Sequence, residues 1–165
     1  MFELKPLSRE AVPAALEKAH RYRLLNEPME AESICRDILE VDPDNQEAAV
    51  TLLLAMTDQF EERPACVEQA RELLSRIQDD YTRTYHSGIV CERKAKAYLS
   101  RGGPRAGHNA YEWFRQAMER FDQAAEIRPA GNDDAILRWN TCARILMNHP
   151  ELVPDMEEAH HSWLE

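Results

Sequence analysis

Glycine, long apolar runs and aromatic side chains are all scarce in this sequence. Five glycines among 165 residues are few for an all-β protein, which needs a turn after every strand, and aromatic residues make up only 7%. No run of 18 apolar residues is present to predict a membrane-spanning helix. The first ten residues have neither a basic start nor an apolar segment, so they do not predict a signal peptide. We therefore expect a cytoplasmic protein with no membrane partner.

The cysteines form no recognisable metal or redox motif. None of the four is part of a CxxC pair, and each falls within a helical pattern: Cys35, Cys66, Cys91 and Cys142. Isolated cysteines on helical faces are typical of buried free thiols in a reducing compartment. We therefore predict neither disulfides nor a metal.

No pattern in the chain predicts catalysis. Cys91 follows His86 by five residues, which is a poor spacing for two side chains on one helical face. The glycine-rich stretch 101–107 lacks the GKS/T ending of a phosphate-binding loop. His160 and His161 are adjacent, so on a helix they point about 100° apart and rarely share one ion. We expect no catalytic residue, no cofactor and no metal site.

Acidic side chains are what the sequence has in excess. Thirty Asp and Glu against twenty Lys and Arg give a formal net charge of −10. Such a surface repels nucleic-acid phosphates and anionic lipids, so neither is expected as a partner. The charge fits a basic or amphipathic protein partner, or it serves solubility alone.

Capping residues and prolines divide the N-terminal part into short helices. Ser8 is expected to cap a first helix that becomes regular near Val12. A second helix is expected to begin at Pro28, a favoured residue for the first turn, and to end before Pro43. Asn45 is then expected to cap a third helix.

The later part of the chain predicts longer helices with a loop between them. A helix is expected from about residue 81 to residue 99, followed by a turn-rich insertion at 100–107. A seventh helix is expected from about 132 to 148, and an eighth, short helix could follow Pro154. Trp163, near the chain end, would either pack on the helices or contact a partner.

Landmark residues repeat along the chain at a nearly constant period. Ala19, Leu53 and Gly88 occupy equivalent places in successive first helices. Two second helices share the same internal steps of four, three and five residues, in Ala31, Cys35, Ile38 and Pro43 and in Ala117, Phe121, Ala124 and Pro129. A weaker middle copy consists of Ala70, Leu74 and Ile77.

On these landmarks the sequence resembles the tetratricopeptide repeat family, over roughly residues 12 to 147. The resemblance implies an all-α fold, a right-handed solenoid of antiparallel helix pairs with seven or eight helices in one domain, 1–165. Repeat one would span 12–45, repeat two 46–80, and repeat three 81–130 with the insertion near 100–107. A capping helix and tail would fill 132–165, because stacked repeats otherwise expose an apolar face at the end of the stack.

The resemblance also implies a concave groove lined by the first helix of each pair. Carrying the family's groove positions over to this chain gives an apolar track with charges of both signs: Leu16, His20, Arg23, Val50, Leu54, Asp58, Tyr85, Ile89, Arg93 and Asp134. The residues with which some family members clamp a chaperone's C-terminal carboxylate are absent, since the corresponding places hold residues such as Leu16, Val50 and Tyr85.

The function that this resemblance implies is binding without catalysis. We expect a scaffold or adaptor that holds a peptide or partner helix in the groove. Two alternatives stay open at this point: a dedicated chaperone for one partner protein, and a regulatory subunit of a larger enzyme. The sequence indicates no oligomeric state.

Overall fold

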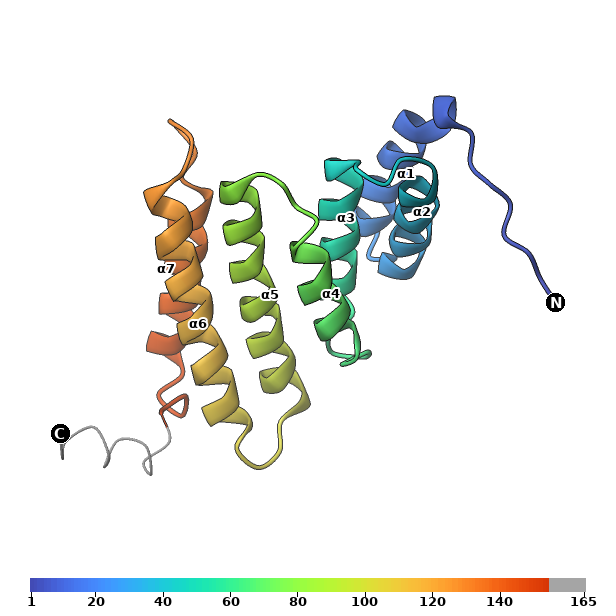
Figure 1. Cartoon of the computed structure of the whole chain (residues 1–165). Coiled ribbons are helices and arrows are strands. Elements are labelled where there is room, and N and C mark those ends of the chain that lie inside the picture. The colour runs from blue at the N-terminus through green and yellow to red at the C-terminus, as the bar shows by residue number, and fades with distance from the viewer. Residues whose placement is uncertain (155–165) are drawn as a thin grey trace. The chain divides into compact units, whose positions relative to one another are not determined.

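The computed structural model describes residues 1–154, which form seven α-helices and no strand (Figure 1). The helices are α1 Val12–Leu24, α2 Pro28–Val41, α3 Gln46–Thr57, α4 Cys66–Leu74, α5 Asp80–Arg101, α6 Ala106–Glu126 and α7 Asp134–Asn148. The all-α prediction is confirmed. The tail with Trp163, the His160–His161 pair and the possible eighth helix lie outside the described residues.

The chain divides into two compact units. One runs from Met1 to Asp79 and holds α1 to α4, and the other begins at Asp80 and holds α5 to α7.

The helix starts in the first unit follow the local sequence, with one exception. α2 begins at Pro28, and the Asn45 side chain caps α3 by accepting a hydrogen bond from the backbone N–H of Ala48 at 2.9 Å. The prediction that Ser8 caps the first helix is wrong. Its side chain makes no capping bond, and a 3-10 turn, Arg9–Ala11, leads into α1.

Small residues let the helices of the first unit pack closely. α1 packs on α2, and α3 packs on both of them, while α4 packs on α3. Most of the repeat landmarks lie in the interior of this unit, since these are completely buried or nearly so: Ala19, Ala31, Cys35, Ile38, Leu53, Ala70 and Ile77. Of the other landmarks, Leu74 is half-buried and Pro43 is exposed. Alanine at such positions allows backbones to approach.

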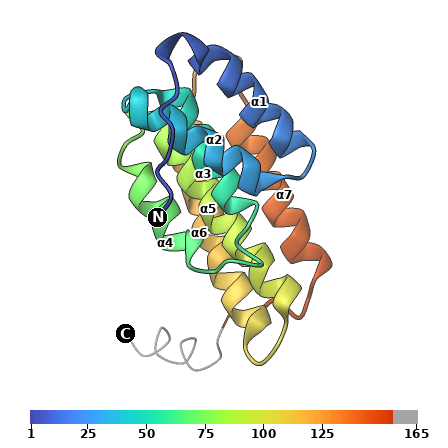
Figure 2. The same ribbon diagram turned by 90° about the vertical axis from the view of Figure 1, so that its right-hand side faces the viewer.

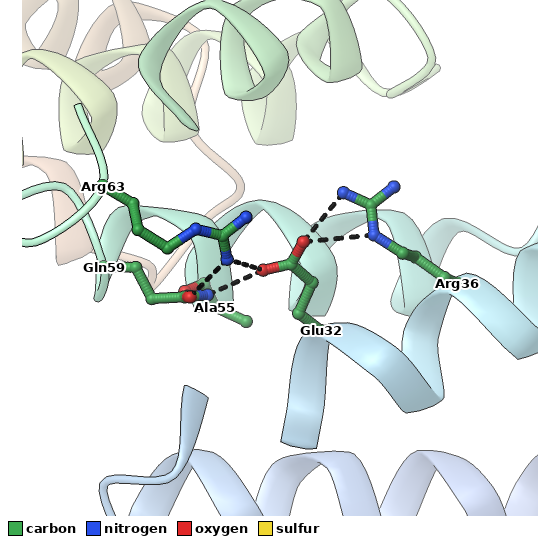
Figure 3. Close-up of polar contacts among 5 residues, drawn as sticks. All are labelled: Glu32, Arg36, Ala55, Gln59 and Arg63. Atoms are coloured by element: carbon green, nitrogen blue, oxygen red, sulfur yellow. Dashed lines mark hydrogen bonds and ion pairs between the residues drawn. The ribbon is translucent and has the colours of Figure 1, made fainter. Parts of the chain in front are cut away.

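A buried carboxylate fixes the loop between α3 and α4 (Figure 3). Glu32 of α2 accepts hydrogen bonds from Gln59 at 2.8 Å and from Arg63 at 3.0 Å, both on that loop. Arg36, one turn along α2, donates to the same carboxylate at 2.8 Å. Burial alone would raise the pKa of Glu32, but the hydrogen bonds from Arg36 and Gln59, together with the positive charges of Arg36 and Arg63, outweigh it and lower that pKa below its ordinary value.

The second unit is built on a long antiparallel hairpin, in which α5 and α6 lie side by side in both views (Figures 1 and 2). α5 has 22 residues and α6 has 21, against 13 and 14 for α1 and α2. The expected insertion at 100–107 is therefore a short turn, and the extra length of repeat three lies in its helices. Gly102, Gly103 and Arg105 make that turn with positive φ angles of 65°, 98° and 64°.

Side-chain bonds attach α7 to both helices of the hairpin. Arg138 of α7 donates to the fully buried carboxylate of Glu92 on α5 at 3.3 Å. The Trp139 indole N–H donates to Asp122 of α6 at 3.1 Å. The third helix of this unit thus contacts the first two, as α3 does in the first unit.

Candidate functional site

An open groove of about 530 Å³ lies between α1 and the start of α3. Its apolar part comes from Val12, Pro13 and Leu16, which follow one another along one face of α1. Val12 and Leu16 are buried, Leu16 with 8% of its surface exposed, so they form the floor, whereas Pro13 is exposed at the edge. The remaining lining is polar: Arg9, Glu17, His20, Asp42, Asn45 and Glu47.

The polar edge of the groove connects the two helices directly. His20 Nε2 of α1 lies 2.9 Å from Glu47 Oε1 of α3, and both side chains are exposed. Asn45, which caps α3, also donates to Asp42 at 2.9 Å, so the loop before α3 is held in place. Three carboxylates (Glu17, Asp42 and Glu47) and two basic side chains (Arg9 and His20) thus surround the apolar floor. Such a surface can accept an apolar side chain together with polar or charged neighbours.

The structure brings Leu16 and His20 into this groove, but it pairs two other predicted residues with each other. Arg23 Nε of α1 donates to Asp58 Oδ2, just after α3, at 2.8 Å. Both residues are among the charged positions that the tetratricopeptide resemblance places in the groove. Because they neutralise each other, their evident role is to hold α1 against the end of α3. Val50 and Leu54, the other two predicted groove residues of α3, are half-buried.

The predicted residues of the second unit are divided between packing and surface. Ile89 is 2% exposed, so the prediction that its side chain is available to a partner is wrong. Tyr85 is half-buried, with its ring centroid 5.8 Å from that of Phe121. Arg93 is half-buried, and Asp134 is exposed at the first position of α7.

Sequence reasoning missed several groove residues, and a simple extension of the predicted faces would have found some of them, such as Pro13 and Glu47. Pro13 lies three residues before Leu16, and Glu47 lies three residues before Val50, so each belongs one helical turn earlier on a predicted face. Asp42 and Asn45 carried no such signal, because they lie in the loop before α3 and reach the groove only through the tertiary fold.

The chemistry of the described residues offers binding groups and little reactivity. All four cysteines are buried free thiols, and burial raises the pKa of Cys35 to about 12. Within residues 1–154 no group of three or more potential metal ligands is present. None of the helices in that part of the chain has the length and apolar character needed to cross a membrane.

Comparison with known proteins adds no relative. No family model matches the chain, and searches of curated proteins and of solved structures return no match. The tetratricopeptide resemblance therefore stays a prediction from the sequence landmarks.

Proposed function

We propose that the protein is a non-enzymatic interaction module of the tetratricopeptide type, with its helix pairs arranged as in a right-handed solenoid. It binds a peptide or a partner helix in the groove between α1 and the start of α3. The observation that carries the proposal is this open groove, with its apolar floor and its His20–Glu47 edge. Two of its residues, Leu16 and His20, are groove positions that the tetratricopeptide resemblance implies.

The groove supports recognition of a short motif. Its volume of about 530 Å³ falls within the range of typical ligand pockets, and it is large enough for a few side chains. An apolar side chain of the partner would displace water from Val12 and Leu16, which supplies affinity. Polar groups beside it would meet Glu17, Asp42 and Glu47, which favours a partner with basic residues. The free, buried thiols support a reducing compartment such as the cytoplasm.

Filling the groove is the direct test. Pro13→Trp places a large ring at the exposed edge of the groove, while Pro104→Trp places the same ring on the exposed α5–α6 turn and serves as the matched control. The tagged protein and both variants would be used to capture partners from a lysate of the native host, followed by quantitative mass spectrometry. We expect Pro13→Trp to lower capture of specific partners by about tenfold, with the control unchanged.

A second pair of variants tests the polar edge. His20→Ala with Glu47→Ala removes the exposed pair across the groove, and His149→Ala with Glu151→Ala removes an equally exposed pair, 2.8 Å long, from the second unit. Leu54→Glu tests a predicted groove residue further along α3, and we expect it to lower partner capture as well. Unchanged capture by all groove variants, with helicity preserved in circular dichroism, would overturn the proposal. One dominant unstable partner would indicate a dedicated chaperone, and an enzyme chain in constant ratio would indicate a regulatory subunit.

A further inference from the structure

Three large apolar side chains lie exposed at the turn between α1 and α2. Leu24 is 88% exposed, Leu25 is 60% exposed and Met29 is 64% exposed. Single exposed apolar residues are ordinary on protein surfaces, but three within six residues of one turn form a patch. We call Leu24, Leu25 and Met29 the corner patch. It shares no residue with the groove between α1 and α3.

A hollow of about 320 Å³ adjoins the corner patch and is lined by acidic side chains. Met29 belongs to both features. The hollow runs from the turn to the α3–α4 loop and includes Glu27, Glu30, Asp58 and Glu62, with no Lys or Arg in its lining. Asp58 pairs with Arg23, whereas the described residues give Glu27, Glu30 and Glu62 no ion pair. Three carboxylates thus stand uncompensated beside an apolar surface.

Both walls of the hollow are held in place by the fold. On one side, Asn26 turns the chain with a φ of 59°, and the backbone N–H of Glu27 donates to the carbonyl of Tyr22 at 2.9 Å. On the other side, Gln59 is buried and donates to Glu32 and to the Ala55 carbonyl, as Figure 3 shows. A surface that is already ordered loses little conformational entropy when it binds a partner.

We propose that the corner patch and its acidic hollow dock a basic amphipathic helix of a protein partner. An amphipathic helix presents an apolar stripe with polar residues along its edges. Its stripe would cover Leu24, Leu25 and Met29, and its flanking Lys or Arg side chains would approach Glu27, Glu30 and Glu62. The negative charge disfavours phosphate-bearing partners at the same place. This surface is additional to the groove of the proposed function and does not depend on it.

The test uses the full chain and two fluorescein-labelled model helices of about 18 residues, or five turns. One is built from Leu and Lys and the other from Leu and Glu, with the same apolar stripe, and binding is measured by fluorescence anisotropy. Two variants alter the surface: the acid variant combines Glu27→Gln, Glu30→Gln and Glu62→Gln, and the apolar variant combines Leu24→Ser, Leu25→Ser and Met29→Ser. Matched controls combine Glu40→Gln, Glu119→Gln and Glu126→Gln, or Ile127→Ser, Leu137→Ser and Met147→Ser, at other exposed sites.

We expect the Leu/Lys helix to bind and the Leu/Glu helix not to bind. Each altered surface should weaken binding at least about tenfold relative to its control. Equal losses in the acid variant and in its control would mean that overall charge alone attracts the peptide, which would overturn the proposal. Loss of peptide binding in Pro13→Trp, with the acid and apolar variants unaffected, would overturn it in favour of the groove. If the groove variants fail to lower partner capture, the proposed function of the groove is contradicted, but the peptide-binding test of the corner patch is not affected.

Discussion

Gly88 of α5 lies directly against the ring of Phe121 on α6. A Cβ atom added at Gly88 would lie 2.5 Å from Phe121 Cε1 and 2.7 Å from Cδ1, which is closer than real Cβ atoms approach. Phe121 is completely buried, so its ring has little room to move. At the equivalent places of repeat one stand Ala19 and Cys35, also fully buried. Thus glycine in the first helix of the pair goes with the large Phe121 in the second, whereas alanine goes with the smaller Cys35 in repeat one.

Gly88→Ala should therefore destabilise the protein, although alanine favours helix over glycine by about 1 kcal/mol. The methyl group must displace the ring of Phe121, and overpacking a tight core typically costs about 1–3 kcal/mol. Urea unfolding followed by circular dichroism measures the change. Phe121→Leu in the same chain should recover part of the loss, because the smaller side chain leaves space for the methyl group. A Gly88→Ala variant more stable than the original protein would show that the ring moves freely.

The second prediction is that the contribution of Glu32 to stability depends on pH, because folding lowers the pKa of its carboxyl group. A carboxyl group whose pKa is lowered on folding stabilises the protein above its unfolded pKa, near 4.5, and this contribution is lost as the pH falls through the folded value. Glu32→Gln should lower the free energy of unfolding at pH 7 by about 1–3 kcal/mol, since Arg63 and Gln59 lose a charged acceptor. The difference in the free energy of unfolding between Glu32→Gln and the original protein should shrink as the pH falls below 4.5.

Urea unfolding at a series of pH values from 7 to about 3 measures this convergence. Glu40→Gln, on the exposed face of the same helix, is the control and should leave the stability almost unchanged. A constant difference between Glu32→Gln and the original protein at all pH values would show that the charge of Glu32 is unimportant.

Local signals predicted several helix starts and the all-α fold, and the tertiary contacts explain much of what they missed. Pro28 and Asn45 define helix starts by their own conformational and capping preferences, so they could be read directly. The pairing of Arg23 with Asp58 joins residues 35 positions apart, and no local pattern indicates that each neutralises the other. Glu32 looks like a surface residue in sequence, but the α3–α4 loop folds over it and supplies two donors. Groove residues on helices were partly predictable, while those on loops were not.

Buried thiols give a third prediction. Burial raises the pKa of Cys35 and of Cys142 to about 12, with the Glu92 carboxylate adding to the effect at Cys142. At pH 8 only about one thiol in ten thousand would then be ionised, and the thiolate is the reactive form. Iodoacetamide labelling followed by peptide mass spectrometry should show both residues almost unmodified in the native protein and fully modified in urea. Fast labelling without urea would show that these helices open readily.

Arg138 provides the last prediction, because it joins α7 to a carboxylate with no contact to water. Burial disfavours the charge on Arg138, but Glu92 and the Tyr85 side chain outweigh this and raise its pKa. Arg138→Met should leave Glu92 with Lys96 as its remaining basic neighbour. We expect the free energy of unfolding to fall by about 1–3 kcal/mol, since a buried charge loses one of its two partners.

The loss should come from the weakened pairing of the buried Glu92 carboxylate and not from the missing arginine itself. Adding Glu92→Gln to Arg138→Met removes the buried charge and should recover stability, because a neutral amide costs less to bury than a carboxylate that has only Lys96 as its partner. Arg144→Met, on the exposed part of the same helix, controls for the loss of a positive charge from α7 and should change the stability by less than about 0.5 kcal/mol. Urea unfolding measures all four proteins. If the double variant is as unstable as Arg138→Met, then packing of the arginine side chain, and not its pairing with Glu92, holds α7 to α5.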